Sequence, residues 1–299
     1  MANTFNDMIN EVKSKLAGYT LKQDRITYLK SAIDNAAVVI PLGSGDNLAK
    51  GIIEIDDEIM YVDSFDTPTS TLNLIPGLGR GFQGTTATSH NINSLITLTP
   101  YFPRQLVKQA INDTIISLFP KLFAVKHTTL TSSAVVTTYA LPTDMNNFIS
   151  ASWQQIGPSK QWELLRRYRI DQMANSTTFG SNSTINIYDR IPNGRTIDCV
   201  YAANASAFSG LTDDFVTVTG LPISCWDVVV LGACSRLLAF IDAGRINMTS
   251  AESDLADSKV PTSAGQTLGK FVYALFQQRL NDEATRMQGQ YRFSPHYIS

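Results

Sequence analysis

The spacing of hydrophobic residues predicts five helical segments. Over residues 5–16 and 21–33, apolar side chains recur every three or four positions, as they do on one face of an amphipathic helix. The same spacing returns over residues 103–119, 224–242 and 267–288. None of these apolar stripes can be buried within its own segment, so we expect the helices to pack against one another.

In the first region between the helices, hydrophobic residues recur at every second position, which is typical of β-strands. Residues 52–55 and 58–62 are two largely hydrophobic runs on either side of Asp56 and Asp57. This pattern predicts a hairpin with a tight turn and two solvated charges. A further strand at 71–74 leads into a glycine-rich turn. We interpret the region as a small β-module.

A second β-rich region extends from about residue 126 to residue 221. β-branched and aromatic residues alternate there, for example over 134–139 and 196–201, and Asn, Gly, Ser and Pro turns separate them. The pattern predicts a second antiparallel β-module.

Together these patterns predict an α+β fold. A helical bundle is built from N-terminal, central and C-terminal helices, and two antiparallel β-modules are inserted into it. The chain of 299 residues is longer than most single domains, so several folding units are expected. The predicted segments are, in order, N-terminal bundle helices (1–35), a small β-module (36–100), a central bundle helix (101–124), a second β-module (125–222), C-terminal bundle helices (223–288) and an extended C-terminal arm (289–299).

Composition narrows the function classes. A hydrophobic content of 43% with 17% charged residues is an ordinary globular balance, and the net charge of −2 argues against a surface that clamps nucleic acid. No apolar run approaches about 18 residues and no secretory signal is visible, so we expect no membrane span and synthesis in a cytosol. Cys199, Cys225 and Cys234 lack CxxC spacing and are expected to be buried thiols.

The glycine-rich motif Gly79–Gly84 spells GxGxxG, but it does not predict a cofactor site. A dinucleotide-binding fingerprint opens a helix and is followed by an acidic residue about 20 positions later. Here the next segment is rich in Thr, Ser and Asn, and no acidic residue follows at that spacing. Glycines at positive φ in a wide hairpin explain the motif.

No catalytic or metal site is predicted either. The consecutive carboxylates Asp56, Asp57 and Glu58 alternate between strand faces and are not expected to converge. The three histidines lack metal-ligand spacing, and no GxSxG element is present. We therefore expect no enzymatic activity, no cofactor and no metal.

The only dense basic cluster contains Arg166, Arg167 and Arg169, with Trp162 and Tyr168 interleaved. Two roles fit this pattern. The arginines either face DNA or pair with acidic residues of a neighbouring subunit.

The C-terminal arm carries large apolar and aromatic residues beyond the last helix. Such side chains are typical of interface anchors, and either the arm folds back onto its own bundle or it inserts into a partner. We expect it to dock onto a partner through Tyr291, Arg292, Phe293, Pro295, His296, Tyr297 and Ile298.

Several blocks of the sequence occur in an order that resembles the head-to-tail adaptor (connector) proteins of long-tailed bacteriophages, and this resemblance covers nearly the whole chain. The order of the blocks carries the resemblance more than any one of them. The blocks are GIIEIDDEIMYV, GRGFQGTTATSH, YFPRQLVKQAINDTIISLFPKLF, ALPTDMNNFISASWQQIGPSKQW, LLRRYRID, TDDFVTVTGLPISCWDVVVLGACSRLLAF and YALFQQRLNDEATRMQGQYR.

The resemblance implies a structural virion protein of the neck, assembled in the host cytoplasm. It implies a ring, generally twelvefold, that binds the portal protein on one side and a stopper or tail-completion protein on the other. DNA would pass through the channel of the ring without sequence-specific binding. The arm would then be the element that docks onto the portal.

Two other functions remain open. Another virion protein, associated with a baseplate or a fibre, would use its β-modules to bind the host or its neighbours. A tail-associated hydrolase is the enzymatic alternative, although no positioned nucleophile, base or metal cluster is visible in the sequence.

Overall fold

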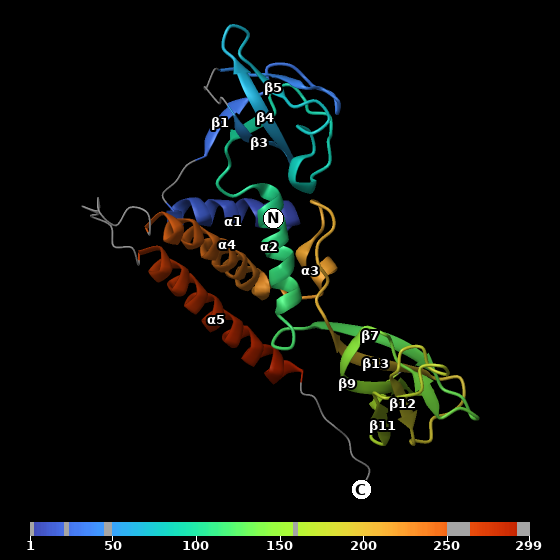
Figure 1. The fold of residues 1–299 in the computed structure, drawn as a ribbon. Helices are drawn as coiled ribbons and strands as arrows, with labels where there is room; N and C mark the ends of the chain where they lie inside the picture. The colour runs from blue at the N-terminus through green and yellow to red at the C-terminus, as the bar shows by residue number, and fades with distance from the viewer. Residues whose placement is uncertain (1–2, 21–23, 45–49, 158–160, 250–263, 292–299) are drawn as a thin grey trace. The chain divides into compact units, whose positions relative to one another are not determined.

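Residues 3–20, 24–44, 50–157, 161–249 and 264–291 are described by a computed structural model. They form five α-helices and thirteen strands in three sheets (Figure 1). The helices are α1 (Phe5–Thr20), α2 (Arg104–Ser117), α3 (Phe215–Thr219), α4 (Trp226–Thr249) and α5 (Ala264–Gln290).

The chain divides into two compact units, each with its own sheets and helices. We call residues 7–111 and 230–272 the barrel unit, and residues 1–6, 112–229 and 273–299 the sandwich unit. The helices α2, α4 and α5 each have residues in both units.

The barrel unit contains one strongly curved, antiparallel sheet in the order β1-β6-β3-β4-β5-β2. Its edge strands approach each other at a bridge between Leu29 and Leu42, so the sheet forms a half-barrel that closes at this point. Buried apolar side chains of β2 to β6, together with Leu29, Ile33 and Leu42 from the segments beside β1 and β2, fill its interior. The strands are β1 (Arg25–Tyr28), β2 (Val39–Pro41), β3 (Gly51–Ile55), β4 (Glu58–Asp66), β5 (Thr71–Leu74) and β6 (Leu95–Leu98).

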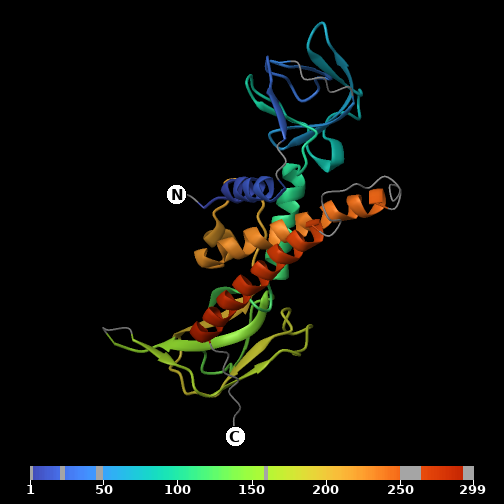
Figure 2. The same ribbon diagram turned by 90° about the vertical axis from the view of Figure 1, so that its left-hand side faces the viewer.

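The sandwich unit contains two antiparallel sheets, in the orders β10-β9-β13-β7 and β11-β12-β8 (Figure 2). One apolar core, with Ile185, Ile197 and Tyr201 among its members, is built from both sheets. The strands are β7 (Ala124–Thr131), β8 (Thr138–Ala140), β9 (Met145–Gln154), β10 (Trp162–Leu164), β11 (Tyr168–Asp171), β12 (Thr184–Ile187) and β13 (Thr196–Ala203).

An aromatic cluster in the sandwich unit fixes the start of the chain. The rings of Phe5 and Phe208 stack at 4.4 Å, and Phe215 contacts both Phe208 and Trp226. A β-bridge between Thr4 and Asp214 runs beside this stack. Residues far apart in the sequence are thus joined by aromatic packing together with a β-bridge.

The predicted architecture, a helical bundle with two inserted β-modules, is wrong. Among the described residues thirteen strands in three sheets stand against five α-helices, and the helices are shared between two strand-containing units instead of forming a separate body. Helical spacing was correct for the buried face of α1, where Met8, Ile9 and Val12 are completely buried. An apolar stripe shows which face is buried, but it does not show whether a helix or a sheet covers that face.

The predicted helix over residues 21–33 is also wrong, because β1 lies there. Ile26 is 59% exposed whereas Leu29 and Ile33 are buried in the half-barrel, so these residues do not share one helical face. The short alternation in Arg25–Tyr28 is confined to four residues, too few to outweigh the helical spacing around it.

Most other predicted elements are confirmed. The hairpin around Asp56 and Asp57 pairs β3 with β4, and a strand occupies 71–74. The central helix is α2, which begins directly after Pro103. The two long C-terminal helices are α4 and α5.

Candidate functional site

The glycine-rich motif of the barrel unit surrounds one buried carboxylate, Glu58 at the start of β4. Arg80 donates from Nε and Nη2 to the two Glu58 oxygens at 2.7 and 2.9 Å. The backbone amides of Gly81 and Thr88 donate to the same carboxylate at 3.0 and 2.9 Å. His90 Nε2 completes the set at 3.0 Å. Five donors therefore converge on a side chain with no exposed surface.

The backbone of this motif has the conformation that its glycines predict. Gly81 and Gly84 have φ of 60° and 78°, and Gln83 between them has φ of 53°. A Cβ on Gly81 would lie 2.8 Å from the carbonyl oxygen of Thr85, so a larger residue would displace the loop. The prediction of a wide turn with positive φ is confirmed.

The electrostatics of the cluster favour the ionised form of Glu58 and the protonated form of His90. Burial alone would raise the pKa of Glu58, but the hydrogen bonds from Arg80, His90, Thr88 and Gly81 lower it to about 2. Burial works against the charged form of His90, but Glu58 and Asp56 outweigh it and raise the pKa of His90. Both ring nitrogens of His90 face a carboxylate, since Nδ1 lies 2.8 Å from Asp56 Oδ2.

This arrangement is unsuited to acid–base catalysis. A carboxylate offers about four lone-pair positions, and all of them are taken by donors from the protein itself. Glu58 has no exposed surface through which a substrate would reach it. The cluster instead ties the long loop that follows β5 to the half-barrel.

Sequence reasoning missed this cluster because it considered the three consecutive carboxylates only in relation to each other. Asp56 and Glu58 are two positions apart, and both reach the same histidine, His90. A usable signal was present: a glutamate among the apolar residues of a strand, with an arginine and a histidine in the next long loop.

A second ionic cluster in the barrel unit joins the hairpin to α1 and α2. Lys13 Nζ lies 3.0 Å from Glu54 Oε1, and the backbone amide of Arg104, at the start of α2, donates to Glu54 Oε2. Asp57 accepts from Arg104 Nε at 3.0 Å and from Lys108 Nζ at 2.9 Å. Burial would raise the pKa of Asp57, but Lys108 and Arg104 lower it.

This second cluster corrects the expectation that both charges of the Asp56–Asp57 turn are solvated. Asp57 is paired with two cations of α2, and Asp56 contacts His90. Carboxylates at the N-terminus of a helix are favoured by its unsatisfied amides and by its dipole, which explains why Glu54 faces the first residue of α2.

The cysteines behave as buried apolar residues, as predicted. Cys199, Cys225 and Cys234 are buried and free. Burial raises the pKa of the Cys199 and Cys234 thiols to about 12 and that of Cys225 to about 11. Such thiols are protonated at neutral pH and are poor nucleophiles.

In the sandwich unit, a groove of about 400 Å³ is lined by residues of the four-stranded sheet, by Leu165 and Tyr168 of the core and by the end of α5. His127, Val200 and Ser150 stand side by side in its floor, one each from β7, β13 and β9. Leu164 and Tyr291 are also in its lining. The floor therefore mixes apolar and hydrogen-bonding side chains.

The strand beside this groove, β10, is an edge of its sheet and carries exposed apolar side chains. Trp162 and Leu164 are 50% and 54% exposed, and they pair with Gln154 and Ser152 of β9. No described strand pairs with the other side of β10. Such an edge, with large apolar groups beside it, is a typical site for contact with another chain.

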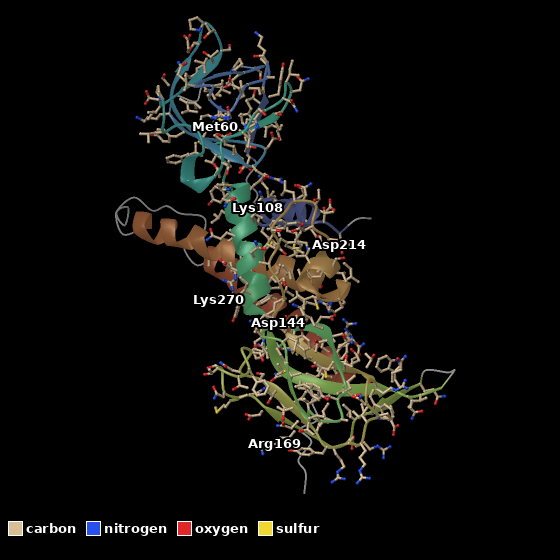
Figure 3. The ribbon with its side chains drawn as sticks, turned by 90° about the vertical axis from the view of Figure 1, so that its right-hand side faces the viewer. Met60, Lys108, Asp144, Arg169, Asp214 and Lys270 are labelled. Atoms are coloured by element: carbon tan, nitrogen blue, oxygen red, sulfur yellow. The ribbon has the colours of Figure 1, made fainter. Side chains whose placement is uncertain are left out.

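Arg166, Arg167 and Arg169 lie together on the sandwich unit and are exposed. Arg169 is on the outer side of the three-stranded sheet and points into solvent (Figure 3). Tyr168 between them is buried in the core. Of the three arginines only Arg169 lies in β11, and Arg166 and Arg167 directly precede the strand.

Of the predicted arm (289–299), residues 289–291 are described: Gly289 and Gln290 lie in α5, so the extended arm does not begin at residue 289, and Tyr291 directly follows the helix. Its ring meets Phe123 edge-on at 6.4 Å, and its amide donates to the Met287 carbonyl oxygen at 2.8 Å. Arg292, Phe293, Pro295, His296, Tyr297 and Ile298 lie outside the described residues.

Within the described part of the chain, no group of three or more His, Cys, Asp or Glu side chains is arranged to hold a metal ion. No described helix combines the length and the apolar character of a membrane span. No protein-family model matches the sequence, and no curated protein matches it either.

Proposed function

We propose that this chain is a structural virion protein, the head-to-tail adaptor that joins the portal of a long-tailed bacteriophage to its tail. The order of its sequence blocks resembles that family. Its most elaborate polar cluster, around Glu58, is saturated by donors of the protein and holds a loop in place. These features favour assembly over catalysis.

The single observation that carries the proposal is the open edge of β10. Trp162 and Leu164 are half exposed there, and the side of β10 that faces away from β9 pairs with no described strand. A large apolar surface beside an unpaired edge is costly in a free protein and is useful in a subunit. We assign this edge to contacts between neighbouring subunits of a ring.

In this proposal the ring contains twelve subunits, as in the family that the sequence resembles. It binds the portal protein on one side and a stopper or tail-completion protein on the other, and DNA passes along its channel. The chain assembles in the host cytoplasm and remains in the neck of the virion. It has no enzymatic activity.

A baseplate or fibre-associated virion protein is the second candidate. The same exposed edge favours it, because β-modules with open edges also bind neighbours in such assemblies. A tail-associated hydrolase has less support, since the carboxylate most remote from solvent, Glu58, is inaccessible to substrate.

Depletion of the chain during phage growth tests the proposal. We expect filled heads and completed but unattached tails in the same lysate, because only the joint between them is missing. Supplying the chain from a plasmid restores joined particles. Electron microscopy of the lysate distinguishes the outcomes: tails still attached to heads, or no assembled tails at all, would contradict the adaptor role.

A further inference from the structure

A compact group of four arginines on the sandwich unit forms a strongly positive surface. Arg166, Arg167 and Arg169 come from the segment that enters β11, and Arg190 follows β12. All four are exposed. The chain as a whole has a net charge of −2, so this surface is a local exception rather than part of a basic protein.

The backbone brings these arginines together. Asp189 Oδ2 accepts from the amides of Arg166 and Arg167 at 2.8 and 3.1 Å, and the amide of Tyr188 donates to the Arg167 carbonyl oxygen at 2.8 Å. The segment 188–190 is therefore held against residues 166 and 167. Arg190 directly follows Asp189 and is therefore brought close to residues 166 and 167.

The pairing of β11 with β12 places two of the arginines on one outward face. Tyr168 faces Ile187 and both point into the core, so Arg167 and Arg169 point away from it. Arg169 lies opposite Asn186, and Tyr188, 48% exposed, continues the same face next to Arg167. This outward face thus offers guanidinium, amide and phenol groups.

The guanidinium groups are available for a ligand. Among the described residues, none of the four makes an ion pair or a side-chain hydrogen bond, whereas Arg80, Arg104, Arg279 and Arg286 all do. Asp189, the carboxylate that contacts this segment, already accepts two backbone amides. Asp171, two residues from Arg169, accepts the amide of Met173.

We propose that Arg166, Arg167, Arg169 and Arg190 form a binding surface for the phosphodiester backbone of a nucleic acid. Guanidinium groups bind phosphate oxygens bidentately, and phosphate contacts require no particular base sequence. The stable core of a protein–protein interface is depleted of charge and rich in apolar groups. The described part of this surface has the opposite character, so a polyanion fits it better than an acidic protein does.

This inference does not depend on the adaptor role. If the chain joins heads to tails but does not bind DNA, only the proposal of a phosphate-binding surface is contradicted. A chain that binds DNA through these arginines but belongs to another part of the virion would overturn only the adaptor role.

The test is the binding of a short fluorescent duplex DNA to the full chain, measured by anisotropy at several salt concentrations. Each phosphate contact contributes about −0.9 to the slope of log K against log salt. Four contacts then predict that affinity falls about 150-fold between about 50 and 200 mM salt. In R167Q/R169Q the same salt change should lower affinity only about 12-fold.

The matched control is K30Q/K50Q, which also removes two positive charges but lies in the barrel unit. Its salt dependence should equal that of the wild type, and circular dichroism should show that both variants fold. Three results would overturn the proposal: no binding by the wild type at low salt, an unchanged slope in R167Q/R169Q, or tighter binding of polyglutamate than of DNA. The last would identify an acidic protein as the partner.

Discussion

Replacing Glu58 with glutamine is expected to lower the free energy of unfolding of the barrel unit by about 3–5 kcal/mol, the range found when one partner of a buried ion pair is removed. The substitution leaves Arg80 and His90 charged and without their shared counter-ion, and their side chains are only 10% and 1% exposed. A glutamine amide also has one acceptor oxygen, where the carboxylate offers two. The loop that carries Arg80, Gly81 and Thr88 should separate from the half-barrel first.

The same substitution should change the response to acid. The pKa of Glu58 is lowered from 4.5 to about 2, so the stability it contributes is present above pH 4.5 and is lost as pH falls towards 2. The shift corresponds to about 3 kcal/mol. The pKa of His90 is raised, so its contribution is present below about pH 6.5 and is lost as pH rises through the higher, folded-state value.

Hydrogen exchange of the β3 and β4 amides in urea, followed from pH 2 to pH 7, measures the stability of the barrel unit, which contains Glu58. The control is D63N, because Asp63 forms a solvent-exposed pair with Lys50 at 3.4 Å and should contribute less than about 1 kcal/mol. If E58Q were as stable as D63N, or kept the acid response of the wild type, the cluster would not hold the loop as described.

Ending the chain after Tyr291 is expected to abolish head-to-tail joining while leaving the subunit folded. Tyr291 is kept because its ring packs against Phe123 and its amide extends the hydrogen bonding of α5. The deletion removes the remaining members of the predicted docking arm, Arg292, Phe293, Pro295, His296, Tyr297 and Ile298. Aromatic and arginine residues of this kind carry most of the binding energy in protein interfaces.

An arm that becomes ordered on binding has modest affinity, and many arms engaged on one ring compensate through avidity. The measurement is the fraction of heads with attached tails after complementation with the truncated chain. The control keeps the length of the chain and replaces Phe293, Tyr297 and Ile298 with serine, and it should fail in the same way. Joining at the wild-type level by the truncated chain would show that the arm is not the docking element.

Local patterns predicted many single elements of this fold but not their assembly. The segment predicted over 103–119 matches α2, Arg104–Ser117, to within two residues, because Pro103 and Pro120 lie on either side of it and proline acts on the backbone within one turn. The helical spacing over 21–33 failed because Leu29 and Ile33 are buried by distant strands, which no local window contains. The second β-region proved to be two sheets around one core, a division set by pairing between residues far apart in the sequence.

The candidate sites show the same limit. The arginines at 166–169 were visible as a run, but Arg190 joins them only through the contacts of Asp189 with residues 166 and 167. The exposed edge of β10 depends on which strands pair, and the spacing of residues in β10 does not reveal it. Clusters formed by neighbours in sequence were thus predictable, and clusters formed by sheet pairing were not.

The central claim is that this chain joins the portal to the tail, and cryo-electron microscopy of the intact neck tests it most directly. The account predicts density for this chain directly beneath the portal, with as many copies as the portal has and with the edge of β10 facing a neighbouring subunit. Density for the chain at the baseplate or on a fibre, or a copy number different from that of the portal, would contradict it.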